Sequence, residues 1–72
     1  MFTIRYTTEN YEGVEYSQYY TEDSKKDAEQ TFKNVCSSLR SDFYGYLYCK
    51  FEVELMEDDK RIDVYGLSDM DE

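Results

Sequence analysis

Residues 24–40 read SKKDAEQTFKNVCSSLR and carry the clearest periodicity in this 72-residue sequence. Apolar side chains recur at i, i+4, i+7, i+8 and i+11, which places them on one stripe of an α-helix. They are Ala28, Phe32, Val35, Cys36 and Leu39. Ser24 is a favourable N-cap, and Asp27 three residues later completes a pattern that resembles a capping box. A helix with one apolar stripe needs one apolar surface to pack on, so the rest of the chain must supply that surface.

Two strands are predicted before this helix. Residues 2–8 alternate apolar or aromatic side chains with polar ones, which is the pattern of a strand with one covered face. Residues 14–21 are rich in Val, Tyr and Thr and also favour a strand. The register of this second strand stays open, because Tyr16 and Tyr20 share one face while Tyr19 lies on the other. An Asn and a Gly between the two runs favour a turn, so we expect an antiparallel hairpin.

A long strand is predicted after the helix, over residues 46–57. Its apolar face carries Leu47, Cys49, Phe51, Val53 and Leu55, and its other face carries Tyr46, Tyr48, Lys50, Glu52, Glu54 and Met56. A polar turn at residues 57–60 leads into the last strand. There the alternation predicts Ile62 and Val64 on the inner face, and Asp63 and Tyr65 on the outer face. We expect Gly66 to end this strand.

The order strand–strand–helix–strand–strand predicts an α+β fold. We expect two layers, with an antiparallel four-stranded sheet (ββαββ) and one helix packed on one face. The chain is predicted to form a single domain over residues 1–67, followed by an acidic C-terminal tail at residues 68–72. Met1 leads directly into the first strand, and no apolar run reaches the roughly 20 residues that span a bilayer. We therefore expect a complete small cytoplasmic protein that does not bind membranes.

The residue types that most metal sites and enzymes need are scarce. The sequence has two cysteines and no histidine. A structural zinc site usually needs four Cys or His ligands, so we expect no metal and no cofactor. Two buried thiols at Cys36 and Cys49 are favoured over one disulfide. No histidine is present to activate a Ser or Cys nucleophile, and no glycine-rich phosphate loop is present, so we expect no catalytic residues and no enzyme.

Charge is the strongest functional signal. Seventeen Asp and Glu residues outnumber eight Lys and Arg residues, and the formal net charge is -9 at pH 7. Self-repulsion of this size works against a compact state, so we infer that the charge attracts a positively charged partner. Direct binding of nucleic acid is not expected, because phosphate contacts require a basic surface.

The outer sheet face is the predicted binding site. Glu52 and Glu54 lie two residues apart on one strand, and Asp63 is expected to join them from the next strand. The candidate carboxylates are Glu12, Glu15, Glu52, Glu54, Glu57, Asp58, Asp59 and Asp63. The candidate aromatic contacts are Tyr46, Tyr48 and Tyr65, because a rigid ring with a hydroxyl is favourable at interfaces. The alternative is an ordinary solvated strand face with strand-forming tyrosines.

The whole profile resembles the small acidic inhibitors that bacteriophages encode, including anti-CRISPR proteins and other DNA mimics. The resemblance lies in size, charge and α+β pattern, with Glu52, Glu54 and Asp63 standing in for a row of phosphates. It implies a non-catalytic inhibitor that binds the basic nucleic-acid-binding surface of a host defence or nucleic-acid-processing complex, in the bacterial cytoplasm.

Three alternatives remain open. The first alternative is a phage inhibitor of host RNA polymerase. The second is a small interaction module that acts as a monomer or weak homodimer through its Tyr-rich sheet face. The third alternative is an enzyme or metal-dependent factor with a pocket that converges on Glu52 and Asp63. A divalent cation at the acidic turn, residues 57–59, is disfavoured because the spacing does not match a calcium loop.

Overall fold

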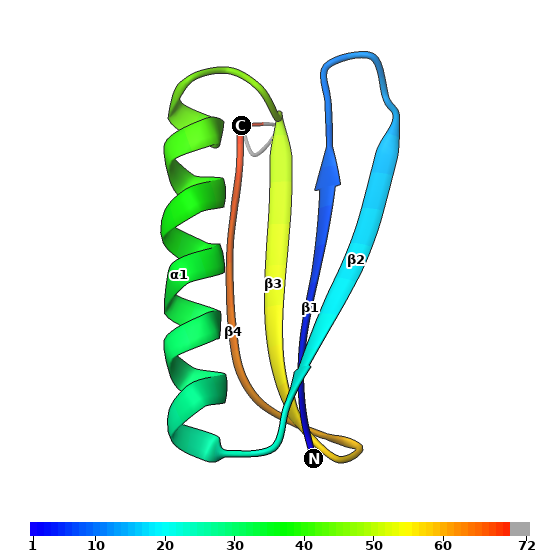
Figure 1. Cartoon of the computed structure of the whole chain (residues 1–72). Coiled ribbons are helices and arrows are strands. Elements are labelled where there is room, and N and C mark those ends of the chain that lie inside the picture. The colour runs from blue at the N-terminus through cyan, green and yellow to red at the C-terminus, as the bar shows by residue number, and fades with distance from the viewer. Residues whose placement is uncertain (70–72) are drawn as a thin grey trace.

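The computed structural model describes residues 1–69. Its elements are β1 (Phe2–Glu9), β2 (Glu15–Glu22), α1 (Lys25–Tyr44), β3 (Lys50–Glu57) and β4 (Lys60–Ser68). The four strands form one antiparallel sheet in the order β2-β1-β3-β4, and α1 runs along one side of it (Figure 1). The predicted ββαββ fold is confirmed.

The core lies between α1 and the two central strands. Its buried members are Phe2, Ile4, Ala28, Phe32, Leu39, Phe51, Val53 and Leu55. The cross-strand pairs Ile4↔Leu55 and Thr8↔Phe51 place alternate residues of β1 and β3 under the helix. Complete burial of a side chain such as Ile4 contributes about 1.5–3 kcal/mol. The apolar stripe predicted for residues 24–40 therefore packs on the centre of the sheet.

The helix begins as predicted and ends one turn later. Ser24 Oγ accepts a hydrogen bond from the Asp27 N–H at 3.4 Å, so the predicted N-cap is confirmed. The helix continues past Arg40 to Tyr44 because Phe43 extends the apolar stripe and packs edge-on against Phe51, with ring centroids 5.8 Å apart.

The strand after the helix is correspondingly shorter than predicted. β3 begins at Lys50, and residues 45–49 form the connection from α1. Tyr46 adopts a φ of 66°, which is outside the strand region, and both Tyr46 and Leu47 are exposed. The prediction that residues 46–49 belong to the strand is wrong, because the extra helical turn takes up part of the chain that would have preceded β3.

An irregularity in β4 reverses the faces predicted for that strand. Pairing runs regularly from Glu57↔Lys60 to Met56↔Arg61 and then continues at Leu55↔Asp63, so Ile62 is one residue too many. Such a β-bulge shifts the alternation by one position, and every later side chain changes face. Tyr65 and Leu67 consequently pack against the core, whereas Val64 is opposite Glu54 on the other face.

Gly66 lies inside β4 and does not end it. The residue is opposite Glu52, and the strand continues to Ser68. A Cβ at Gly66 would lie 2.6 Å from the carbonyl oxygen of Phe51, which is closer than real Cβ contacts. Glycine is therefore needed at this position because the two strands approach closely, and not because the chain turns there.

No helix within residues 1–69 combines the length and the apolar character that crossing a membrane requires. The predicted tail falls mostly on residues 70–72, which lie outside the described residues. Ser68, the first residue of that predicted tail, belongs to β4.

Candidate functional site

The sheet face that points away from α1, here called the outer face, consists of four cross-strand rows. Written from β2 to β4, they are Glu15–Glu9–Lys50–Ser68, Ser17–Thr7–Glu52–Gly66, Tyr19–Arg5–Glu54–Val64 and Thr21–Thr3–Met56–Arg61. Carboxylates concentrate in the first two rows, at the end of the sheet that carries the β1–β2 loop. In the third row, Arg5 and Glu54 form an ion pair at the centre, and Tyr19 and Val64 lie at the two ends.

Three carboxylates line one hollow in the first two rows. This acidic hollow is formed by Glu9, Glu15 and Glu52 with Lys50 among them, and its volume is about 150 Å³. Glu9 lies directly opposite Glu15 on one side and directly opposite Lys50 on the other. Like charges opposite one another destabilise a sheet. A single lysine offsets one of the three charges, so the hollow keeps a net negative charge that a cation from outside would neutralise.

Glu54 does not add to this negative surface. Arg5 donates from Nε and Nη2 to one oxygen of Glu54, and Arg61 donates from Nη1 to the other oxygen at 3.1 Å. The hydrogen bond and charge of Arg5, together with Arg61, hold the pKa of the Glu54 carboxyl below its usual range. The Glu54 side chain is only 16% exposed. It therefore ties β1, β3 and β4 together and is already neutralised within the chain.

The acidic turn lies at the other end of the sheet. The N-terminal ammonium of Met1 pairs with Asp58 at 3.1 Å, and the Asp58 N–H donates to the Met1 carbonyl. Glu57 and Asp59 are exposed beside it. Within residues 1–69, ion pairs reach only two carboxylates, Glu54 and Asp58.

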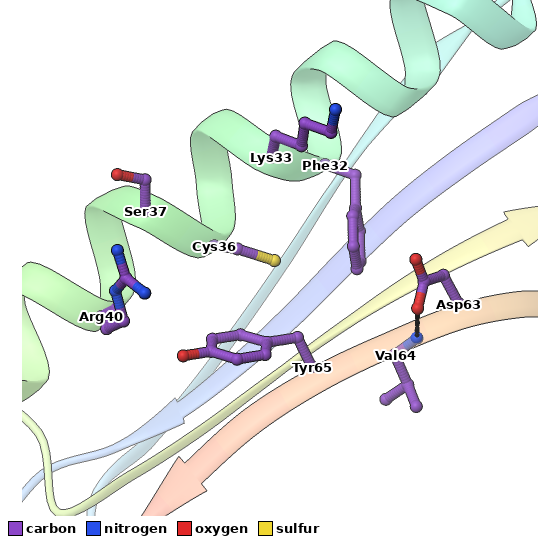
Figure 2. Close-up of a pocket in the computed structure, with 8 residues that line it drawn as sticks. All are labelled: Phe32, Lys33, Cys36, Ser37, Arg40, Asp63, Val64 and Tyr65. Carbon is purple, nitrogen blue, oxygen red and sulfur yellow. Dashed lines mark hydrogen bonds between the residues drawn. The ribbon is translucent and has the colours of Figure 1, made fainter.

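Asp63 and Tyr65 are not on the outer face, so their predicted grouping with Glu52 and Glu54 is wrong. The bulge turns them toward α1, where they line a cleft with Phe32, Cys36 and Arg40 (Figure 2). Asp63 accepts a hydrogen bond from the Val64 N–H at 2.8 Å. The Tyr65 ring packs on Phe51, with centroids 5.9 Å apart. Tyr65 therefore contributes to the core.

The remaining predicted residues lie in connections. Tyr46 is 78% exposed and precedes β3, while Tyr48 is half-buried and packs against the core. Neither belongs to the outer face of β3. Glu12 is exposed in the β1–β2 loop, next to Tyr11, whose hydroxyl donates to Asp69. Of the predicted site residues, Glu15 and Glu52 meet in the acidic hollow, while Asp63 and Tyr65 meet in the cleft beside α1.

An exposed group of tyrosines on β2 was not predicted as a site. Tyr16, Tyr19 and Tyr20 are 58%, 64% and 41% exposed. The signal was present in the sequence, because residues 14–21 have no consistent apolar face. A strand without an apolar face is not covered by another layer. The tyrosines of residues 14–21 fall on both faces, and this distribution indicates that the strand is exposed.

The environments of the two cysteines disfavour the reactive thiolate form. Cys36 points into the cleft between α1 and β4, which has a volume of about 310 Å³ (Figure 2). Burial, with a contribution from Asp63, raises the pKa of Cys36 to about 11, so the thiol stays protonated near neutral pH. Cys49 donates to the carbonyls of Glu9 and Asn10, and burial raises its pKa as well. These two cysteines, both in the described part of the chain, form no disulfide with each other.

The described residues contain no group of three or more His, Cys, Asp or Glu side chains arranged to hold a metal ion. Comparison of the chain with protein-family models, with curated proteins and with solved structures finds no match.

Proposed function

We propose that this protein is a non-catalytic inhibitor that binds the basic, nucleic-acid-binding surface of a bacterial protein complex through the acidic end of its outer face. The acidic hollow carries this proposal. Glu9, Glu15 and Glu52 line one depression on an open sheet face, with Lys50 as its only lining cation. A Lys or Arg side chain of a partner would enter the hollow and replace the missing countercharge.

The charge of the whole molecule supports the same role. Because most carboxylates of residues 1–69 are outside ion pairs, the net charge of -9 remains available for long-range attraction. Such attraction raises the association rate with a positively charged partner and weakens as salt is added. The proposed site is smaller than the sequence suggested, since Glu54 is neutralised and Asp63 faces the helix.

A capture experiment tests this role. The wild-type protein and the variant Glu9→Gln/Glu15→Gln/Glu52→Gln are immobilised, exposed to a bacterial lysate at low salt and then challenged with a short DNA duplex. We expect the wild type to retain a nucleic-acid-binding protein that the duplex displaces. The variant should bind the same protein roughly tenfold more weakly, because three charge contacts of about 0.5 kcal/mol each are lost.

The matched control removes the same number of charges elsewhere, with Asp23→Asn, Glu29→Gln and Asp42→Asn on α1 and the segment before it. This control should retain the captured protein at near wild-type affinity. Equal loss in both variants would show that only net charge matters, and undiminished binding by the first variant would contradict the proposal. The identity of the captured protein separates a defence complex from RNA polymerase.

A further inference from the structure

The outer strand β2 is an open sheet edge. It pairs with β1 over all eight residues without a break, from Phe2↔Glu22 to Glu9↔Glu15. Seven of its residues are exposed and the last, Glu22, is half-buried. Figure 1 shows β2 diverging from α1 toward the β1–β2 loop, and the helix meets the strand at its other end, where the Thr31 hydroxyl donates to Glu22 at 2.8 Å. A long, regular edge of this kind is a template for pairing with another strand.

The backbone groups that point outward from this edge follow from the hairpin. The Asn10 N–H donates to the Val14 carbonyl at 3.0 Å, which makes these two residues a hydrogen-bonded pair. Bonded and non-bonded pairs alternate along an antiparallel ladder, so the odd-numbered residues of β2 direct their backbone groups away from β1. They are Glu15, Ser17, Tyr19 and Thr21. The Cys49 N–H donates to the Glu9 carbonyl, so this carbonyl points away from β2. The same alternation requires that direction, because Glu9 and Glu15 form a non-bonded pair.

The opposite edge of the sheet is protected. β4 contains the bulge at Ile62 and carries Lys60 and Arg61. Bulges and edge cations are features by which natural sheets prevent the addition of strands. β2 has neither a bulge in its pairing with β1 nor any Lys, Arg, Pro or Gly. The two edges therefore differ, and only β2 is suited to strand addition.

Beside the open edge lies an aromatic groove between β2 and α1. Its lining residues are Tyr6, Tyr20, Asn34, Val35, Ser38 and Leu39, and its volume is about 190 Å³. Farther along the same side of β2, the hydroxyls of Tyr6 and Tyr16 both donate to Gln18 Oε1, at 3.1 and 2.9 Å. Alternate side chains of an added strand would contact these rings, which attract cations to their faces.

We propose that β2 accepts an extended basic segment of the partner protein as a fifth strand of the sheet. The charge of the edge selects this occupant: β2 begins at Glu15, ends at Glu22 and carries no cation. A second copy of the chain would bring together two edges that each carry two glutamates and no cation, so like charges would repel one another. The inference rests on the proposed function for the positive charge of the partner and adds the mode of binding.

The test uses a fluorescent peptide of alternating Lys and Val, as long as β2, and two reference peptides. One is the Lys-Val peptide N-methylated at every backbone nitrogen, which keeps the charge and the side chains but removes the backbone donors, and the other alternates Glu and Val. We expect wild-type protein to bind the Lys-Val peptide about tenfold more tightly than either reference. The variant Ser17→Pro should lose this preference, because it removes an outward N–H while sparing the ladder to β1. Ser17→Ala is the control and should bind like wild type.

A second variant, Glu15→Lys/Glu22→Lys, covers the case in which Ser17→Pro fails to fold. It should transfer the preference from the Lys-Val to the Glu-Val peptide. Equal binding of the Lys-Val peptide and its N-methylated form would overturn strand addition and leave the proposed acidic hollow untouched. Sedimentation equilibrium without peptide gives a further outcome: a dimer that Ser17→Pro dissociates would show that a second copy occupies the edge, which also overturns the proposal.

Discussion

Two glutamates two residues apart on β3 have opposite roles at the scale of single residues. Glu54 is bound by Arg5 and Arg61 and joins three strands, whereas Glu52 is exposed and lines the acidic hollow. Both side chains lie on the outer face of β3. The difference in their roles therefore comes from the residues opposite them on the neighbouring strands. Arg5 is opposite Glu54, while Thr7 is opposite Glu52.

Glu54→Gln should lower the free energy of unfolding by about 1 kcal/mol at pH 7, since it removes two partly exposed ion pairs. Glu52→Gln is the matched control and should change stability by less than about 0.5 kcal/mol. Because the pKa of Glu54 is lowered in the folded state, its stabilisation is present above the ordinary carboxyl pKa, about 4.3, and is lost as the pH falls through the lowered value. Urea unfolding at several pH values measures both effects. A difference between wild type and Glu54→Gln that persists at very low pH would contradict this account.

The bulge in β4 decides the inner and outer faces at the scale of elements. With regular pairing, Ile62 and Val64 would face α1, as the alternation predicted. The extra residue instead brings Tyr65 against Phe51 and exposes Val64. A large aromatic ring buries more apolar surface than Val, which favours the bulged register. The same shift moves Asp63 into the cleft beside α1.

Alanine substitutions in β4 distinguish the two registers. Tyr65→Ala should lower the free energy of unfolding by about 2 kcal/mol, because a half-buried ring is removed from the core, whereas Val64→Ala should cost less than about 1 kcal/mol. Urea denaturation of both variants measures these values. The reverse order would show that β4 pairs without the bulge and that Val64 faces the helix.

Charge repulsion opposes folding at the scale of the whole molecule. The chain carries a net charge of -9, and the described residues have principal extents of 35 × 20 × 20 Å. The screening length is about 30 Å at 0.01 M salt and about 8 Å at 0.15 M, so at low salt nearly every carboxylate interacts with the others. In the described part, two carboxylates form ion pairs, whose attraction added salt weakens. The repulsion among the remaining carboxylates, which salt also weakens, is the larger effect.

Stability should therefore rise with ionic strength. Between 0.01 M and 0.15 M NaCl, we expect the free energy of unfolding to increase by on the order of 1 kcal/mol, which corresponds to about 4–8 °C in Tm for a domain of this size. Thermal unfolding followed by circular dichroism measures the change. MgCl2 at matched ionic strength is the control for specific cation binding. A constant or falling Tm would mean that the carboxylates are neutralised within the fold.

Part of the candidate site followed from the sequence. Glu15 and Glu52 are both predicted as partner contacts, and they meet because β2 and β3 each pair with β1, which the alternation of neither strand indicates. The predicted cluster around Asp63 and Tyr65 failed because one inserted residue changes the face of everything after it. The predicted place of Tyr46 on the outer face was wrong because an extra helical turn displaced the start of β3.

The sequence by itself determined the ββαββ order, the N-cap of the helix, its apolar stripe and the excess of negative charge. These properties depend on periodicity and composition, which are local or additive. Only the tertiary structure decided which carboxylates are neutralised, which face Tyr65 occupies and that β2 remains an open edge. Those outcomes depend on which residue of a neighbouring strand lies opposite, and pairing between distant segments is not encoded in the pattern of either strand alone.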